Sequence, residues 1–193
     1  YAKNKLIYEG EAEKTDDYAY RKWQEGYSYG QQFGYLVDYS NGNGYFNTLE
    51  ELENSQLSYQ FGTPRLGDLI YKDLNKDGKI DERDEAPVGT GALPRIVYAI
   101  SGGVSYKSFD LNILFQGVGD YSAITTGTGI WGTDYDGVFN SLHRDAWTPG
   151  RYANGEKITW PALSVNTSTS QQPSDFVTFN KAYLRIKHVE LSY

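Results

Sequence analysis

The stretch RIVYAISGGVSYKSFDLNILFQG, residues 95–117, carries the clearest pattern in the chain. Apolar residues alternate with polar or small ones along both halves, with Val97 as the exception, which is the period of a β-strand with one apolar face. The apolar set is Ile96, Tyr98, Ile100, Val104 and Tyr106, followed by Phe109, Leu111, Ile113 and Phe115. Because only Lys107 and Ser108 separate the halves, the pattern predicts two antiparallel strands of about 10 residues joined by a tight turn.

A third strand is predicted at residues 183–193, with an irregularity in its middle. With regular alternation, Leu184 and Ile186 would lie on one face, and the apolar residues after them would lie on the other. One extra residue near Lys187 and His188 brings all of them to the same side. A β-bulge has this effect, so we predict one there.

Strands with one apolar face fit two environments. A transmembrane β-strand needs only about 9 to 11 such residues. Tyr98 near one end of the hairpin, and Tyr106 with Phe109 near the turn, fit the aromatic girdles of an outer-membrane barrel. A hairpin in a soluble β-sandwich would show the same alternation, so periodicity alone does not separate the two.

Composition narrows the class of protein. The 193 residues include 18 Tyr and 21 Gly, with 39% hydrophobic residues, which suits an all-β secreted domain or part of an outer-membrane barrel. A net charge of −7 without a basic cluster argues against nucleic acid as a partner. The absence of cysteine excludes disulfides and thiolate metal sites. Because the chain starts at Tyr1 and ends within a strand pattern, we expect a fragment of a larger protein.

An acidic loop, DLNKDGKIDERD at residues 73–84, has the spacing of a calcium-binding loop. Gly78 supplies the sharp turn, and Ile80 is the apolar position of such loops. The predicted ligands are Asp73, Asn75, Asp77, the Lys79 carbonyl, Asp81 and Asp84. Asp84 stands where a longer Glu is usual, so an altered or weaker site is expected. Since residues 68–71 are extended in pattern and Pro87 follows closely, we expect a structural Ca²⁺ clip without flanking helices, not a sensor.

The two excursions that flank the hairpin are predicted to be long polar loops with short helices. Thr48 and Glu51 form a capping box that predicts a helix over 49–54. Apolar spacing predicts a second helix over 136–146 with His143 on its polar, exposed side. No self-sufficient hydrophobic core is expected between residues 10 and 93.

Aromatic residues in the second excursion are candidates for substrate contact, since aromatic faces stack on sugars. The candidates are Trp131, Tyr135 and Trp160, although loop packing explains them as well and is favoured. No nucleophile–base set, phosphate loop or histidine metal cluster is present, and lone acid pairs in polar loops are usually solvated. An enzyme is therefore not expected.

Several phrases, in order along nearly the whole chain, resemble the SusC/RagA family of TonB-linked outer-membrane receptors. They are residues 33–35 (FGY), 67–81 (GDLIYKDLNKDGKID), 105–111 (SYKSFDL), 115–117 (FQG), 146–149 (AWTP) and 183–193 (YLRIKHVELSY). One departure is Leu66, where the family pattern has a proline. It does not disturb the proposed calcium ligands.

The resemblance implies a bacterial outer-membrane importer. Such receptors are large barrels with an N-terminal plug that engages TonB, and they take up oligosaccharides or peptides together with a SusD-like surface lipoprotein. This chain resembles a C-terminal section of the barrel, without the plug or the TonB-contacting region. The implied fold is all-β: an antiparallel transmembrane β-barrel section with long extracellular loops carrying short helices.

The expected organisation follows from the short periplasmic turns and long outer loops of such barrels. Residues 1–9 would end a strand, 94–118 would form a transmembrane hairpin and 181–193 a transmembrane strand. Residues 10–93, with the acidic loop, and 119–180 would then face outside. The alternative is a secreted, calcium-stabilised β domain for adhesion or carbohydrate binding. The two differ in whether the apolar strand faces contact lipid or are sealed beneath a second sheet.

Overall fold

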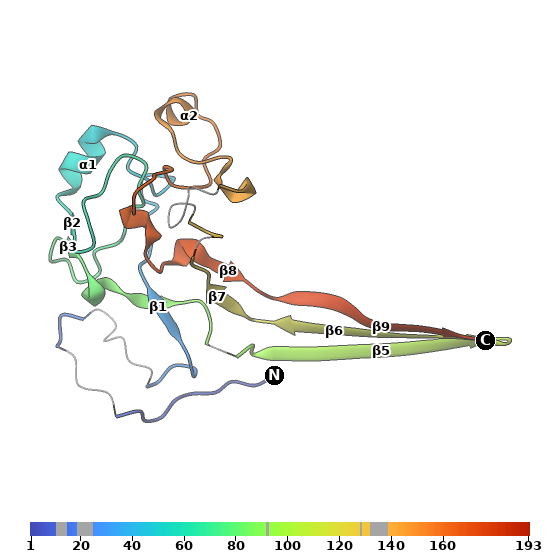
Figure 1. Ribbon diagram of the computed structural model, residues 1–193. Coiled ribbons are helices and arrows are strands. Elements are labelled where there is room, and N and C mark those ends of the chain that lie inside the picture. Colours follow the sequence, from blue (N-terminus) through green and yellow to red (C-terminus); the bar gives the residue numbers. More distant parts are fainter. Residues whose placement is uncertain (11–14, 19–24, 92, 128, 132–138) are drawn as a thin grey trace.

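The computed structural model describes residues 1–10, 15–18, 25–91, 93–127, 129–131 and 139–193. The chain is mostly β, in several small sheets with a few short helices. One sheet of long strands projects from a body formed by the other segments (Figure 1). No helix in these ranges has the length and apolar character needed to cross a membrane.

The projecting sheet has three antiparallel strands in the order β5-β6-β9. They are β5 (Ile96–Tyr106), β6 (Phe109–Gly119) and β9 (Tyr183–Ser192). The predicted hairpin is present: Tyr106 pairs with Phe109 across the two-residue turn. Lys107 takes a positive φ of 55° in this turn. A tight antiparallel turn needs such a residue, because its backbone must match the twist of the strands.

The predicted bulge in β9 is confirmed. Leu114 of β6 pairs with His188, whereas the next residue, Phe115, pairs with Ile186. Lys187 is therefore the extra residue without a partner on β6. The shift changes the alternation of β9 at the point where the sequence required it.

In the described ranges, the body contains three two-stranded sheets and six short helical segments. Strand β1 (Gln32–Gly34) pairs antiparallel with β4 (Ala86–Val88), β2 (Ser58–Tyr59) parallel with β3 (Lys79–Ile80), and β7 (Ser122–Ile124) antiparallel with β8 (Thr178–Asn180). The α-helices are α1 (Leu49–Ser55) and α2 (Pro149–Ala153). The 3-10 segments are η1 (Glu82–Asp84), η2 (Ser141–His143), η3 (Thr169–Gln171) and η4 (Asp175–Val177).

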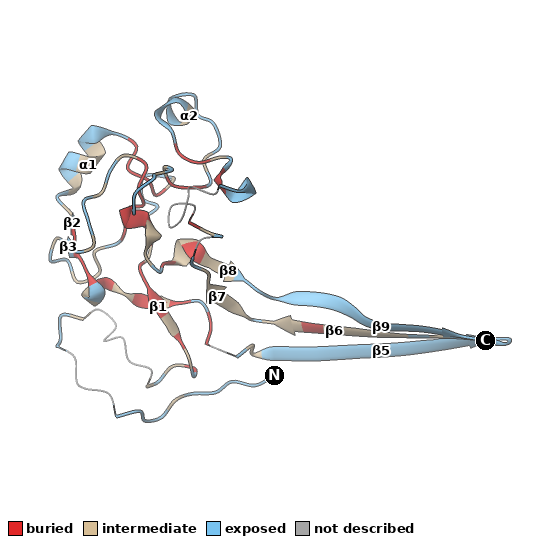
Figure 2. Cartoon of the chain, in the orientation of Figure 1, coloured by how far each residue is buried: buried red, intermediate tan, exposed pale blue. Residues whose placement is uncertain are grey.

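Residues 10–93, which were expected to have no hydrophobic core of their own, contribute most of one. Buried residues concentrate in the body, whereas β5 and β9 are exposed and β6, between them, is mostly intermediate (Figure 2). The larger cluster is Tyr35, Val37, Tyr45, Phe46, Tyr59, Leu69, Tyr71, Ile80 and Trp147, and the smaller is Trp131, Ala146, Trp160 and Val177. Tyr35 with Val37, and Leu69 with Tyr71, have the i, i+2 spacing of a strand, but no single period connects the whole set. Tertiary packing brings these separate segments together.

The two excursions form this body jointly. The Trp147 Nε1–H donates to Asn47 Oδ1 at 3.1 Å, and the Ala162 N–H donates to the Gly67 carbonyl at 2.9 Å. Gly67 has a φ of 81°, and a methyl group there would meet the Trp147 ring at 2.4 Å. Residues about 100 positions apart are thus held in direct contact, and the two segments are not independent loops.

The helix predictions had different outcomes. Helix α1 is confirmed with its capping box, since Thr48 accepts from the Glu51 N–H and Glu51 accepts from the Thr48 N–H. The helix predicted over 136–146 is wrong in its described part, residues 139–146, where only the 3-10 turn η2 forms. There the Trp147 N–H donates to the Trp160 carbonyl at 2.8 Å, so extended pairing replaces the helix.

Two local expectations are corrected as well. His143 is buried, not on the surface: its Nδ1 accepts the Asn140 N–H at 3.0 Å, and its Nε2 lies 2.8 Å from the Ile130 carbonyl. Residues 1–10 contain no strand, because their backbone makes isolated contacts instead of a ladder. One such contact is the Leu6 N–H, which donates to the Tyr27 carbonyl at 2.8 Å.

Candidate functional site

The strand register places most of the large apolar side chains of the three long strands on one face of the sheet. Aligned rows such as Val104–Leu111–Leu191 and Ile100–Phe115–Ile186 cross it. Because of the bulge, Leu184 and Val189 share this face too. The full set, named the apolar face below, is Ile96, Tyr98, Ile100, Val104, Tyr106, Phe109, Leu111, Ile113, Phe115, Leu184, Ile186, Val189, Leu191 and Tyr193.

No element of the described structure covers the apolar face. Ile100 is 65% exposed and Leu191 is 70% exposed. A soluble monomer seldom exposes a contiguous apolar patch above roughly a few hundred Å². The apolar face is continuous across three strands, so we expect it to contact a nonpolar partner or solvent.

Aromatic side chains lie towards both ends of the apolar face. Near the body, Tyr98 lies across Gly117, where a methyl group would meet its ring at 2.4 Å. The Tyr98 hydroxyl donates to the Tyr183 carbonyl at 3.5 Å. At the turn, the Phe109 and Tyr193 rings are 5.2 Å apart. This distribution matches the two interfacial girdles that bound an apolar band.

The opposite face of the sheet is mainly polar, although Val97, Val118 and Tyr183 form an apolar row at the end near the body and Leu114 lies farther along it. Arg185 Nη2 donates to Gln116 Oε1 at 3.0 Å, and His188 Nε2 lies 3.5 Å from Glu190 Oε2. The Ser105 hydroxyl donates to Asp110 nearer the turn. The sheet therefore has one apolar face and one mainly polar face.

The strands of this sheet are as long as strands that cross the apolar band of an outer-membrane barrel. Each of β5 and β6 has 11 residues. At about 3.4 Å per residue and a tilt of about 45°, such a strand rises about 26 Å, close to the ~25 Å apolar band of outer-membrane barrels.

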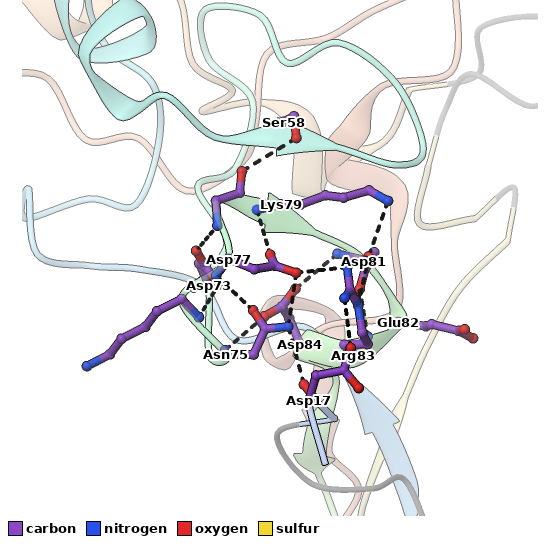
Figure 3. A network of polar contacts seen from close by, with 12 residues as sticks. Asp17, Ser58, Asp73, Asn75, Asp77, Lys79, Asp81, Glu82, Arg83 and Asp84 are labelled. Atoms are coloured by element: carbon purple, nitrogen blue, oxygen red, sulfur yellow. Dashed lines mark hydrogen bonds and ion pairs between the residues drawn. The ribbon is translucent and has the colours of Figure 1, made fainter. Parts of the chain in front are cut away.

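The acidic loop forms a second candidate site, at the edge of the body (Figure 3). Asp73 organises its first turn: its oxygens accept the N–H groups of Lys76, Asp77 and Gly78 at 2.7, 3.2 and 2.7 Å. Gly78 has a φ of 80°, which permits the sharp turn predicted for it. Ile80 is fully buried in the larger core cluster and anchors the loop.

The guanidinium of Arg83 occupies the middle of this loop. It binds both oxygens of Asp81, with Nη2 at 2.6 Å from Oδ2, and the same Nη2 lies 2.8 Å from Asp77 Oδ2. Its Nη1 is 2.8 Å from Asp17 Oδ2. The bidentate bond to Arg83 lowers the pKa of Asp81 to about 2.

Asp84 is turned inward. It is fully buried, and its two oxygens accept the backbone N–H groups of Leu74, Asn75 and Asp81. Burial raises its pKa, whereas these backbone hydrogen bonds lower it. Among the described residues, no three or more Asp, Glu or His side chains form a group that could hold a metal ion.

The six predicted calcium ligands are therefore engaged differently from the sequence-based expectation. Asp73 and Asp84 bind backbone N–H groups, and Asp77 and Asp81 are paired with Arg83. The Asn75 side-chain oxygen accepts the Asp77 N–H at 3.0 Å. In this arrangement Asp77 and Asp81 are bound to Arg83, so an ion at these two carboxylates would compete with its guanidinium. Calcium binding stays a prediction from the sequence.

The aromatic candidates for substrate contact are not free on the surface. Trp131 and Trp160 are each 5% exposed, with ring centroids 5.0 Å apart, and the ring of His143 lies 5.1 Å from that of Trp160. A hollow beside them has room for about one water molecule. Tyr135 lies outside the described residues. Loop packing therefore accounts for both tryptophans.

Sequence reasoning missed Arg83 and Asp17 as members of the acidic loop. Arg83 lies at position 11 of the twelve-residue pattern, which supplies no ligand in a calcium loop. An arginine among five acids was a signal for an internal ion pair. Asp17, in contrast, lies 66 residues from Arg83 and had no local signal.

The chain is similar to one curated protein of transport. It is 25% identical over 132 residues to TonB-dependent receptor P3 from Formosa agariphila, which covers 66% of this chain and 12% of the receptor. No protein-family model matches the chain. The similarity indicates a distant relation to a receptor of outer-membrane transport, of which the chain spans only a small part.

Proposed function

We propose that this chain is part of a TonB-dependent importer in the bacterial outer membrane. In this proposal β5, β6 and β9 are neighbouring strands of its transmembrane barrel wall. The apolar face contacts lipid, and the polar face lines the interior. The body lies at the outer surface, since it is connected to the strand ends opposite the short Lys107–Ser108 turn.

One observation carries the proposal: the apolar face is continuous across three strands and uncovered. The alternative of a secreted β domain requires a second sheet packed over this face. The body instead folds around its own two aromatic clusters and leaves the apolar face exposed. The distant similarity to a TonB-dependent receptor supports the same assignment.

Partners and substrate follow from the family resemblance. The importer would take up oligosaccharides or peptides with a SusD-like surface lipoprotein and would be energised by TonB through a plug region. Among the described residues, the body supplies the outer-surface segments available to substrate and lipoprotein. The proposal includes no catalytic step.

Single cysteines test the lipid contact: this chain contains none, and any cysteine elsewhere in the full-length protein is first replaced by serine. Ile113→Cys probes the apolar face, and Asn112→Cys, the adjacent residue on the same strand, probes the polar face. In outer-membrane vesicles that carry the full-length protein, a lipid-soluble thiol reagent should label only the first. A water-soluble maleimide should label only the second.

The opposite pattern, or equal labelling by the water-soluble reagent at both positions, would contradict the proposal. Recovery of the full-length protein in the soluble secreted fraction would favour the secreted β domain instead. Each cysteine variant is checked for folding by washing the vesicles with urea. Urea extracts unfolded protein, whereas a folded integral barrel stays in the membrane.

A further inference from the structure

We propose that the guanidinium of Arg83 serves as the built-in cation of the acidic loop, so that the loop closes without a metal ion. Its second role is to tie residues 15–18 to the loop. This inference concerns the body alone and does not depend on the transport function.

Arg83 contacts several carboxylates at once. One guanidinium bridges three carboxylates from two segments, those of Asp77, Asp81 and Asp17. It has five N–H donors in a planar fork, which suits bidentate binding of the carboxylate of Asp81. A delocalised cation can thus replace a metal ion in neutralising these acids.

The ion pair of Asp81 and Arg83 is also partly buried. The Asp81 side chain is only 5% exposed and that of Arg83 is 26% exposed, so the pair is partly withdrawn from water. A buried carboxylate without a cation would carry a large desolvation cost. Asp81 also caps η1 by accepting the Arg83 N–H at 2.9 Å, so its position is set by the backbone as well.

Arg83 also links the loop to the preceding segment. Arg83 Nη1 binds the Asp17 carboxylate, Asn75 Nδ2 donates to the Asp17 carbonyl at 3.3 Å, and the Tyr18 hydroxyl donates to Glu82 at 2.7 Å. These contacts come from both ends of the acidic loop. The loop and residues 15–18 are therefore fastened together around Arg83 (Figure 3).

The test is amide hydrogen exchange over residues 73–84, in full-length protein held in detergent micelles. In the wild-type protein, exchange should be the same with Ca²⁺ and with EDTA. Arg83→Gln should speed exchange at the loop amides, among them Lys79, at least about tenfold, because the substitution removes the guanidinium from Asp77 and Asp81 and leaves Asp81 only the half-exposed Lys79 ammonium at 3.4 Å. Arg151→Gln is the matched control and should leave loop exchange unchanged, since Arg151 pairs only with Asp145 and Glu156 among the described acids.

Two results would overturn the inference. One is protection of the wild-type loop by Ca²⁺, with loss of that protection in EDTA, which would show that a metal ion closes it. The other is an Arg83→Gln loop that exchanges as slowly as wild type. If Arg83→Gln does not fold, Arg83→Lys is measured instead. Lysine keeps the positive charge but lacks the planar set of N–H donors, so loop exchange should be accelerated less than in Arg83→Gln. No acceleration at all in Arg83→Lys would contradict the proposal.

Discussion

A positive charge at the centre of the apolar face should destabilise the protein, and the same charge on the polar face should not. Ile113 pairs with Gly102 and Val189, and it lies five residues from Ser108 in the turn. At about 3.4 Å per residue and a tilt of about 45°, this places it about 12 Å from the turn. That depth is the middle of an apolar band of about 25 Å.

The expected cost follows from this depth. Arginine at the midplane of an outer-membrane barrel costs about 2–4 kcal/mol, and near the interface about 0–1 kcal/mol. Ile113→Arg should therefore lower the free energy of unfolding by about 2–4 kcal/mol, a factor of about 30 to 1,000 in the folding equilibrium. Tyr106→Arg, beside the turn, should cost less than about 1 kcal/mol from lipid exposure.

The assay is equilibrium unfolding by denaturant of the full-length protein in phosphatidylcholine vesicles. Asn112→Arg is the matched control, because it places the same side chain at the same depth on the opposite face. The reasoning is refuted when Asn112→Arg costs as much as Ile113→Arg. It is also refuted when the cost at Tyr106 equals that at Ile113, because burial depth in lipid would then not govern the effect.

Three further predictions concern packing and pH. Gly117→Ala should lower the free energy of unfolding, followed by heating, by about 1–3 kcal/mol, since the added methyl group would meet the Tyr183 carbonyl of the next strand at 2.6 Å. Gly102→Ala should lower it less, because the space beside Gly102 is open. Trp147→Ala should cost the body about 3–5 kcal/mol and expose it to limited proteolysis, whereas Leu49→Ala, at an exposed position, should not. Burial raises the pKa of Tyr59 above its usual value, because the folded protein favours the neutral phenol. The neutral Tyr59 therefore stabilises the fold fully below about pH 10, and this stabilisation is lost as the pH rises further. Tyrosinate absorbance should then appear together with unfolding, and free titration of the buried tyrosines in the folded protein would contradict this.

The sequence predicted those features of the structure that depend on residues close together in the chain. Alternation in residues 96–115 specified the hairpin, and the phase change in residues 183–193 specified a bulge that the pairing of Leu114 and Phe115 bears out. The capping box at Thr48 was equally local. The helix predicted up to residue 146 failed because the Ala146–Trp160 pairing, a long-range contact, overrode the local apolar spacing.

The sequence by itself determined the long strands, the turn between β5 and β6 and the sharp turn at Gly78, because each depends on residues within a few positions of one another. Only the tertiary structure decided that the two excursions form one body around Tyr71 and Trp147, and that Arg83 reaches Asp17. Those contacts join residues tens of positions apart. Their geometry arises from packing and charge pairing in the folded chain, and no short-range pattern in the sequence encodes it.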